Sequence, residues 1–376
     1  MSCLYFDHNA TTPLAPEVAD TYASALREVY GNASSVHTTG QMAKRRLEQS
    51  RRTVGAFVNA SPGELVFTSG GTESNNLAIL GLVRALPAGP KHVIASTIEH
   101  PAVLETMRQL ERDGVAVSYA RTGADGIVRP EDIRRHLRPE TVLISVMHAN
   151  NEVGTIQPIQ EIARIAHEHG AYFHSDGVQA FGKIDVDVQA LGIDLYSMSA
   201  HKVFAPKGVG ALFVRKGIPF RGIQSGGHHE RERRAGTENV PGIIAFAAAV
   251  ELSRKRADVA SVRDRFEAQA GGEVNGDRSR RLPNTSNLLF RGVSGEAMVI
   301  ALDMRGMAVS TGSACSSGSI EPSHVLLAMG RTVEEARSSV RFSFGPANTF
   351  EDADRLAAAV NQCTGKLRKE APHVAV

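Results

Sequence analysis

The stretch ELVFTSGGTESNNLAILGLVRAL, residues 64–86, decides the fold of this chain. Its first residues, ELVFT, form a short apolar run of the kind found in strands. Two glycines, Gly70 and Gly71, then lead into NNLAILGLVRAL, which is long and apolar enough for a helix. A strand that turns through glycine into a helix is the repeating unit of α/β proteins, so we expect that fold class.

The same alternation continues along the chain. Helices with apolar residues at helical spacing are predicted at 100–114 and 158–170, and the second opens with proline and closes with glycine. Strands are predicted at 92–96, 115–120, 141–147, 171–176, 193–199 and 208–216. Strands separated by helices argue for a mostly parallel sheet with helices on both faces.

A change in character near the end of a helical stretch at 241–270 predicts a second domain. The sequence that follows, GGEVNGDRSRRLPNTS at 271–286, is rich in turn-forming residues. We expect a large cofactor-binding domain over residues 15–255 and a smaller α+β domain formed by residues 1–14 and 256–376. The smaller domain would close with a helix at about 350–369.

The composition excludes several classes of partner. The 42 basic and 40 acidic residues nearly cancel, so neither nucleic acid nor an anionic membrane is expected as the main partner. No apolar run approaches the roughly 18 residues needed to span a bilayer. The first residues, MSCLYFDHNATT, lack the basic and then apolar pattern of a signal peptide, so we expect a cytoplasmic protein.

The cysteines, Cys3, Cys315 and Cys363, form no CxxC pair. Neither a disulfide framework nor a cysteine-built zinc site is expected, and no metal site is predicted. Cys315 stands among small residues and glycines in VSTGSACSSGS, residues 309–319, where the backbone is conformationally permissive. No basic residue flanks Cys315, so the local sequence offers no activation of a thiolate. Cys3 and Cys363 are expected to be packing or incidental residues.

Lys202 is the first candidate for chemistry. It follows the strand predicted at 193–199, beside His201 and ahead of a glycine-containing turn. A desolvated lysine in such a position can form a Schiff base with a carbonyl compound. The alternative is an ordinary surface lysine at a strand exit, and this stretch alone favours that alternative.

Two features upstream favour the Schiff-base interpretation of Lys202. Asp176 ends an apolar strand, and pyridoxal phosphate needs a carboxylate against its ring nitrogen. The alternative for Asp176 is an aspartate that caps the next turn. Gly71 and Thr72 open a helix, where free backbone N–H groups and the helix dipole favour a phosphate, although many strand–helix connections use Gly-Gly.

A phosphate cradle, a strand-end aspartate and a later lysine, in that order, resemble the fold-type I pyridoxal phosphate enzymes. Longer motifs extend the resemblance over nearly the whole chain: DHNATTP (7–13), TSGGTESNN (68–76), EHPAVL (99–104), MHANNEVG (147–154), HSDGVQ (174–179), SAHKVFAPKGVG (199–210), RRAGTEN (233–239) and STGSACSSGSIEPSHVL (310–326). Together they are similar to the cysteine desulfurases of the NifS/IscS kind. The lone cysteine followed by EPSHVL resembles the branch of that family with the longer cysteine loop.

The resemblance implies a role for each matching residue around the ring of the cofactor. Lys202 would hold the cofactor, Asp176 would pair with its ring nitrogen and Gln179 would bond its phenolic oxygen. His100 would stack on the ring and assist proton transfers. Without the other motifs, His100 would be interpreted as a solvated histidine at the start of a helix.

The resemblance also assigns the phosphate contacts. The expected phosphate-binding residues are Gly71, Thr72, Ser199 and His201. Thr237 would reach the phosphate bound in the neighbouring subunit, so two active sites would share the interface of a homodimer. The alternative for the segment around Thr237 is a solvated charged loop.

Two residues match the positions that bind the substrate carboxylate in the family. They are Asn151 and Arg341, and a carboxylate calls for a planar bidentate donor such as a guanidinium. Without the resemblance, Arg341 would be interpreted as the solvent-facing residue of an edge strand.

The implied reaction converts L-cysteine to L-alanine. Lys202 would remove the Cα proton, and the thiolate of Cys315 would attack the substrate sulfur and keep it as a persulfide. A sulfur-acceptor or iron–sulfur scaffold protein would take that sulfur, and Cys315 could transiently ligate an iron–sulfur cluster during transfer. Residues 266–276 look shorter than the corresponding family segment, and the identity of the acceptor stays open.

Four other functions compete with this interpretation. A selenocysteine lyase or another class V aminotransferase would share the fold and the cofactor, but an aminotransferase would not need the cysteine segment. A non-catalytic sulfur-relay scaffold would keep only the fold, and the presence of Lys202, Asp176 and Cys315 argues against it. No GxGxxG follows the first strand, which argues against a nucleotide-binding protein.

Overall fold

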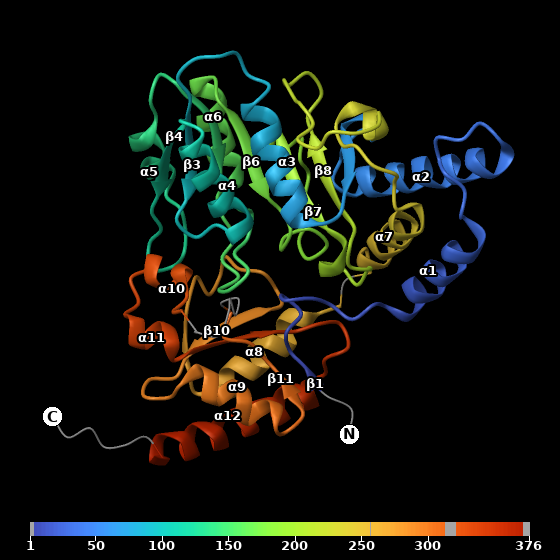
Figure 1. The fold of residues 1–376 in the computed structure, drawn as a ribbon. Coiled ribbons are helices and arrows are strands. Elements are labelled where there is room, and N and C mark those ends of the chain that lie inside the picture. Colours follow the sequence, from blue (N-terminus) through green and yellow to red (C-terminus); the bar gives the residue numbers. More distant parts are fainter. Residues whose placement is uncertain (1–3, 256, 313–320, 371–376) are drawn as a thin grey trace.

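The structure is a computed structural model that describes residues 4–255, 257–312 and 321–370 (Figure 1). Its largest sheet within these residues has seven strands in the order β2-β8-β7-β6-β5-β3-β4. They are β2 (Leu65–Thr68), β3 (His92–Ser96), β4 (Ala116–Ala120), β5 (Thr141–Ser145), β6 (Tyr172–Asp176), β7 (Leu195–Ser199) and β8 (Gly210–Val214).

The sheet is mostly parallel, as predicted. Strands β7, β6, β5, β3 and β4 run parallel to one another, and β8 is antiparallel to both of its neighbours, β2 and β7. All seven strands fall within the predicted segments. The largest difference is at β8, which begins two residues after and ends two residues before the segment predicted at 208–216.

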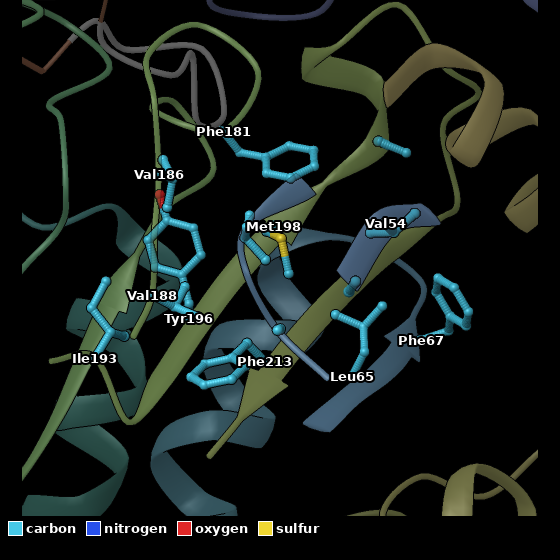
Figure 2. Close-up of a cluster of buried hydrophobic side chains, with 14 of the residues drawn as sticks. Val54, Leu65, Phe67, Phe181, Val186, Val188, Ile193, Tyr196, Met198 and Phe213 are labelled. Atoms are coloured by element: carbon cyan, nitrogen blue, oxygen red, sulfur yellow. The ribbon is translucent and has the colours of Figure 1, made fainter. Parts of the chain in front are cut away.

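Alternate residues of the strands serve two separate cores. Leu65 and Phe67 of β2 join one core, while Val66 between them joins the other. The first core packs under α1 (Pro16–Glu28), α2 (Thr38–Phe57), α5 (Pro130–His136), α6 (Ile159–His169) and α7 (Val240–Ser253), and the second under α3 (Gly71–Val83) and α4 (Pro101–Arg112). Figure 2 shows part of the first core, with Phe67, Tyr196 and Phe213 gathered on one face of the sheet. This two-residue period is what a sheet covered on both faces requires.

The rest of the described chain forms a third core below the large sheet (Figure 1). Its elements are β1 (Leu4–Tyr5), α8 (Val259–Ala270), β9 (Glu273–Val274), β10 (Thr285–Leu289), α9 (Gly295–Asp303), β11 (Met307–Ala308), β12 (Ser339–Ser343) and α12 (Phe350–Glu370). Two short helices, α10 (His324–Ala328) and α11 (Val333–Arg337), pack in a separate small cluster with Ile98, Met147 and Val153. Strands β12, β10 and β9 form an antiparallel sheet, and β1 pairs with β11. The final helix, α12, agrees with the helix predicted at about 350–369, and the helical stretch predicted at 241–270 consists of two helices, α7 and α8.

The third core combines Phe6 with buried residues between Val262 and Cys363. Cys363 is 3% exposed, which confirms that it is a packing residue. The domain boundaries at residues 14 and 255 stay a prediction. No helix in the described ranges is both long enough and apolar enough to cross a membrane.

The strand ends needed for a site meet at one edge of the large sheet. β6 ends at Asp176, its parallel neighbour β7 ends at Ser199, and Ser199 pairs with Gly210 at the start of β8. A Cβ atom on Gly210 would lie 2.7 Å from the Cα atom of Gly70, so the turn into α3 packs directly against this edge. In open α/β sheets, ligands bind at the carboxyl ends of the parallel strands.

Gly177 provides a test of the packing at this edge. A Cβ atom there would overlap the ring of Tyr196, which is fully buried. We expect Gly177→Ala to lower the free energy of unfolding by about 3 kcal/mol, because the core has no room for the methyl group. Gly365→Ala is the control, since a Cβ atom at this exposed position of α12 would have nothing within 4 Å. That change should be neutral or stabilising by roughly 0.5–1 kcal/mol, and equal urea-unfolding midpoints for the two variants would refute the packing argument.

Candidate active site

The turn before α3 forms a cradle for an anion. The first N–H groups of α3 have no partner within the helix and carry its positive dipole end. A Cβ atom on Gly71 would lie 2.7 Å from Cγ2 of Val178, so only glycine lets the helix approach the strand ends this closely. The hydroxyl of Ser199 is buried beside Gly71 and has no hydrogen-bond partner among the described residues. The predicted phosphate contacts Gly71 and Ser199 are therefore neighbours.

Asp176 is buried at the end of β6, with 5% of its surface exposed. Its Oδ1 atom accepts a hydrogen bond from the Val178 N–H at 3.0 Å, so the turn-capping alternative describes part of what this carboxylate does. Its Oδ2 atom accepts a second bond from Nδ2 of Asn75 at 2.7 Å. Asn75 was not singled out in the sequence, although it lies in the TESNN motif one helical turn into α3. Two donors from different elements hold the carboxylate in one orientation.

Lys202 lies in the short 3₁₀ helix η2 (Ala200–Lys202), directly after β7. Its Nζ atom donates to the carbonyl oxygens of Asn9 at 2.5 Å and Ala10 at 2.7 Å. Burial lowers the pKa of Lys202 to about 8, and the positive charge of Arg341 also lowers it. The negative charges of Asp7 and Asp176 raise the pKa, but by less. The surface-lysine alternative is therefore wrong.

His201, the next phosphate candidate, hydrogen-bonds through Nδ1 with the hydroxyl of Thr11 at 3.1 Å. Burial, with help from the charge of Lys202, lowers the pKa of His201 to about 4, so the ring is neutral at physiological pH. A neutral imidazole can still donate one hydrogen bond to a phosphate.

His100 precedes α4 and caps it, because its Nδ1 atom accepts a hydrogen bond from the Ala102 N–H at 3.1 Å. The cap fixes the tautomer: a neutral ring must carry its proton on Nε2. The side chain is exposed, as the solvated-histidine alternative expected, but it lines a hollow of about 440 Å³ together with Thr72. Desolvation by the surrounding protein lowers the pKa of His100, and the positive charge of Lys202 lowers it further. The negative charge of Asp176 acts in the opposite direction but does not outweigh these effects.

Gln179 joins this group through the N-terminal segment. Its Nε2 atom donates to the Asn9 carbonyl at 3.0 Å, the same oxygen that Lys202 contacts. Its Oε1 atom accepts a hydrogen bond from Nζ of Lys183 at 2.7 Å. Asn9 and Lys183 were not singled out in the sequence, although Asn9 lies in the DHNATTP motif. Lys183 is four residues after Gln179, and that spacing is the only signal the sequence held.

Arg341 is buried, with 4% of its surface exposed, so it does not face solvent as the alternative expected, although β12 is the edge strand of its three-stranded sheet. Its guanidinium donates to the carboxylate of Asp7 at 2.6 Å and to the carbonyl of Asn151 at 3.1 Å. The Nε atom is buried without a hydrogen-bond partner within the described ranges. The structure thus brings the two predicted carboxylate-binding residues into contact, and Asn9 bonds the same carbonyl of Asn151 through Nδ2 at 3.1 Å.

Cys315 lies outside the described residues, but both neighbouring segments approach one carboxylate. Ser323 donates its hydroxyl to Oε2 of Glu152 at 2.5 Å, and a Cβ atom on Gly312 would lie 3.3 Å from the same oxygen. Burial raises the pKa of the Glu152 carboxyl. Glu152 directly follows Asn151 in the sequence. Gly312 and Ser323, the residues on either side of the cysteine segment that contact Glu152, therefore lie next to the expected substrate position.

Thr237 is exposed in the loop between η3 (His229–Glu232) and α7. No hydrogen bond found in the described part of the chain joins it to the residues above. The loop itself is anchored, because Arg234 pairs with Glu73 in the first turn of α3 at 2.8 Å. In η3, Glu230 is buried and forms a bidentate pair with Arg51 at 2.6 and 2.7 Å.

The chain is similar to known proteins over nearly its whole length. The family model "Aminotransferase class-V" matches residues 4–356. The cysteine desulfurase IscS of Dictyoglomus turgidum is 45% identical, with 98% of this chain and 96% of that protein covered. The cysteine desulfurase IscS of Methanosarcina thermophila is 43% identical over 98% of this chain and 94% of that protein.

Solved structures show the same relationship. A NifS-like protein superimposes with a TM-score of 0.91 at 34% identity, covering 97% of this chain and 100% of that one. A structure described as SspA in complex with cysteine gives a TM-score of 0.84 at 36% identity, covering 92% and 100%. The predicted fold is confirmed. The chain therefore belongs to the class V aminotransferase family, in which its full-length relatives carry the name cysteine desulfurase.

Proposed function

We propose that this chain is a pyridoxal phosphate-dependent cysteine desulfurase, which converts L-cysteine to L-alanine and keeps the sulfur as a persulfide on Cys315. The observation that carries the proposal is the convergence on Asn9. Its carbonyl accepts hydrogen bonds from Lys202 and Gln179, and its side chain bonds the carbonyl of Asn151. A single residue, Asn9, thus contacts both the expected cofactor lysine and the expected carboxylate site.

The described residues fit pyridoxal phosphate. The open N-terminus of α3, the unpartnered hydroxyl of Ser199 and the glycine contact at Gly71 suit a phosphate. Asp176 offers a carboxylate oriented by two donors, which suits a protonated ring nitrogen. Lys202 offers an amine whose lowered pKa makes it a better nucleophile at neutral pH. Class V aminotransferases depend on this cofactor, and its assignment to these residues is part of the proposal.

When bound, the cofactor withdraws electrons from the amino acid and makes its Cα–H acidic. Lys202 supplies the base, because an amine with a pKa of about 8 is partly neutral at pH 7–8 and can take that proton. His100 carries its own proton on Nε2, the nitrogen that its helix cap leaves free. It is therefore suited to donate a proton from that atom and to receive one back there.

Arg341 orients the substrate through its carboxylate. Asp7 fixes the guanidinium from one side by the 2.6 Å contact, so the side chain cannot swing away. The unpartnered Nε–H points to a free donor for a ligand. A carboxylate held here keeps the Cα–H and the side chain of cysteine in fixed directions.

Cys315 receives the sulfur. Its thiolate attacks the sulfur of the substrate, an S–S bond forms as the C–S bond breaks, and the electron pair of the broken bond stays on the substrate carbon. That carbon takes up a proton, so one cysteine and one protein thiol give one alanine and one protein persulfide. An acceptor protein then removes the outer sulfur for iron–sulfur clusters or other sulfur-containing products. The enzyme acts as a cytoplasmic homodimer, with Thr237 reaching the phosphate in the partner subunit.

Cys315→Ser tests the sulfur-accepting role. We expect alanine formation to fall about 10³-fold or more, because a hydroxyl cannot accept the sulfur, and such a loss is usual for a nucleophile. In the wild-type protein, mass mapping after incubation with labelled cysteine should show the extra sulfur on Cys315 only. Cys363→Ala is the matched control, since Cys363 is buried in the third core. An unchanged rate of alanine formation in the Cys315→Ser enzyme would refute the proposal.

Arg341→Lys tests substrate binding. A lysine keeps the charge opposite Asp7 but loses the planar pair of donors, so KM for cysteine should rise about tenfold or more with a smaller change in kcat. Cysteamine, which lacks the carboxylate, should be used equally poorly by both enzymes. If the variant kept the full preference for cysteine over cysteamine, Arg341 would not be the carboxylate site.

Uptake of the cofactor should report the pKa of Lys202. Only the neutral amine can attack pyridoxal phosphate, so the rate of uptake by cofactor-free protein should rise with pH, with its midpoint near pH 8, and then level off. Stopped-flow absorbance between pH 6 and 10.5 would measure this midpoint. A rate that keeps rising to the ordinary lysine value of roughly 10.4 would contradict the lowered pKa.

A further inference from the structure

Lys183 is a second lysine beside the site, and the proposed reaction gives it no task. It is half-buried in the turn that follows β6, four residues after Gln179. Its Nζ atom donates to Oε1 of Gln179 at 2.7 Å and to Oδ1 of Asn9 at 2.8 Å. Burial and the positive charges of Lys202 and Arg341 lower the pKa of Lys183 well below 10.5. The amine makes two hydrogen bonds here, and in either protonation state it has enough N–H groups to donate both.

These contacts decide which end of the Gln179 amide faces Lys202. The oxygen and nitrogen of an amide have nearly the same shape, so hydrogen-bond partners determine the orientation. Lys183 is a donor and requires the oxygen. The nitrogen is then left to face the Asn9 carbonyl, which it contacts at 3.0 Å and which Lys202 contacts at 2.5 Å. The NH₂ end of Gln179 therefore lies on the side of the cofactor lysine.

The support for Lys183 is itself fixed. Oδ1 of Asn9 accepts a further hydrogen bond from Nδ2 of Asn284 at 3.0 Å. Nδ2 of Asn9 donates to the Asn151 carbonyl at 3.1 Å and to the hydroxyl of Thr285 at 2.8 Å. Reversing the Asn9 amide would break all of these bonds, so its oxygen is held toward Lys183.

We propose that Lys183 is a positioning residue that locks the Gln179 amide with its NH₂ group toward the phenolic oxygen of bound pyridoxal phosphate. The inference rests on the proposed function, because the phenolic oxygen is present only if the cofactor binds at Lys202. Without Lys183, only the Asn9 carbonyl would still hold the amide in this orientation. Reversal would then become easier, and the reversed amide would place its oxygen against the oxygen of the ring. The cofactor would lose a donor and gain a repulsion at the same atom.

The loss has a spectroscopic signature. A donor at the phenolic oxygen draws away electron density that the ring shares with the nitrogen linking it to Lys202, so that nitrogen releases its proton more easily. Removing the donor raises the pKa of the protein-bound chromophore. The charged or titratable groups that interact with Lys183 are Lys202, Arg341, His8 and His201, and all of them are retained in the variants below.

The test is an absorbance titration of the cofactor-loaded protein carrying Lys183→Met. We expect the chromophore pKa to rise by about one unit, the size of one lost hydrogen bond, and the dissociation constant for pyridoxal phosphate to rise several-fold. Lys183→Arg keeps donors at this position, and the adjoining pocket of about 580 Å³ has room for the larger group. Its titration should stay close to that of the wild type. Lys216→Met, at an exposed position, is the control for removal of a lysine.

A double-mutant cycle separates positioning from a structural effect. Gln179→Met should raise the chromophore pKa by itself, and Lys183→Met should add nothing in that background, because it acts through Gln179. Independent shifts that add would overturn the proposal, as would a Lys183→Met protein that titrates like the wild type. If Lys183→Met does not fold, a Lys183→Arg shift as large as that of Gln179→Met would also overturn it. Wild-type protein that takes up no pyridoxal phosphate would instead refute the proposed function.

Discussion

The hydrogen bonds of one buried residue, Asn9, hold the site together. Its four polar groups bond seven partners: Gln179, Lys183, Lys202, Asn151, Asn284, Thr285 and Ser343. These partners come from the edge of the large sheet, from the segment that carries the expected carboxylate site and from two strands of the third core. In a region that excludes water each bond is stronger, and each group left unpaired is costly. The network therefore fixes the relative positions of the cores more firmly than packing alone.

The same network explains why Lys202 is not an ordinary lysine. Its amine is surrounded by backbone carbonyls rather than carboxylates, so it is hydrogen-bonded without being neutralised. Arg341 is paired with Asp7, but its positive charge still disfavours a second positive charge on Lys202. Desolvation and like charge act together, which is the usual way in which proteins produce a reactive amine.

Local sequence patterns predicted the strands well and the site residues only in part. Short apolar runs between turns located β2 to β8 because such runs depend on near neighbours. Lys202, by contrast, was better explained as a surface residue until long motifs revealed the family resemblance. Asn9, Asn75 and Lys183 were missed, since their partners are either distant in the sequence or of a residue type without a distinctive pattern. Cys315 lies outside the described residues, so its role still rests on the resemblance and on the relatives.

Glu152 contacts the described residues on both sides of the cysteine segment, and this allows the length of that segment to change independently of the substrate-binding residues. It holds Ser323 directly and packs against Gly312, while its own backbone is fixed by Asn150 and Asn287. These contacts involve only Glu152 and its neighbours, so the positions of the two anchors do not depend on the residues between them. If Cys315 carries the sulfur as proposed, the length of the segment between the anchors can diverge among relatives while the proposed cysteine-binding residues stay in place. New recipients for the sulfur could be acquired in this way without any change to the chemistry.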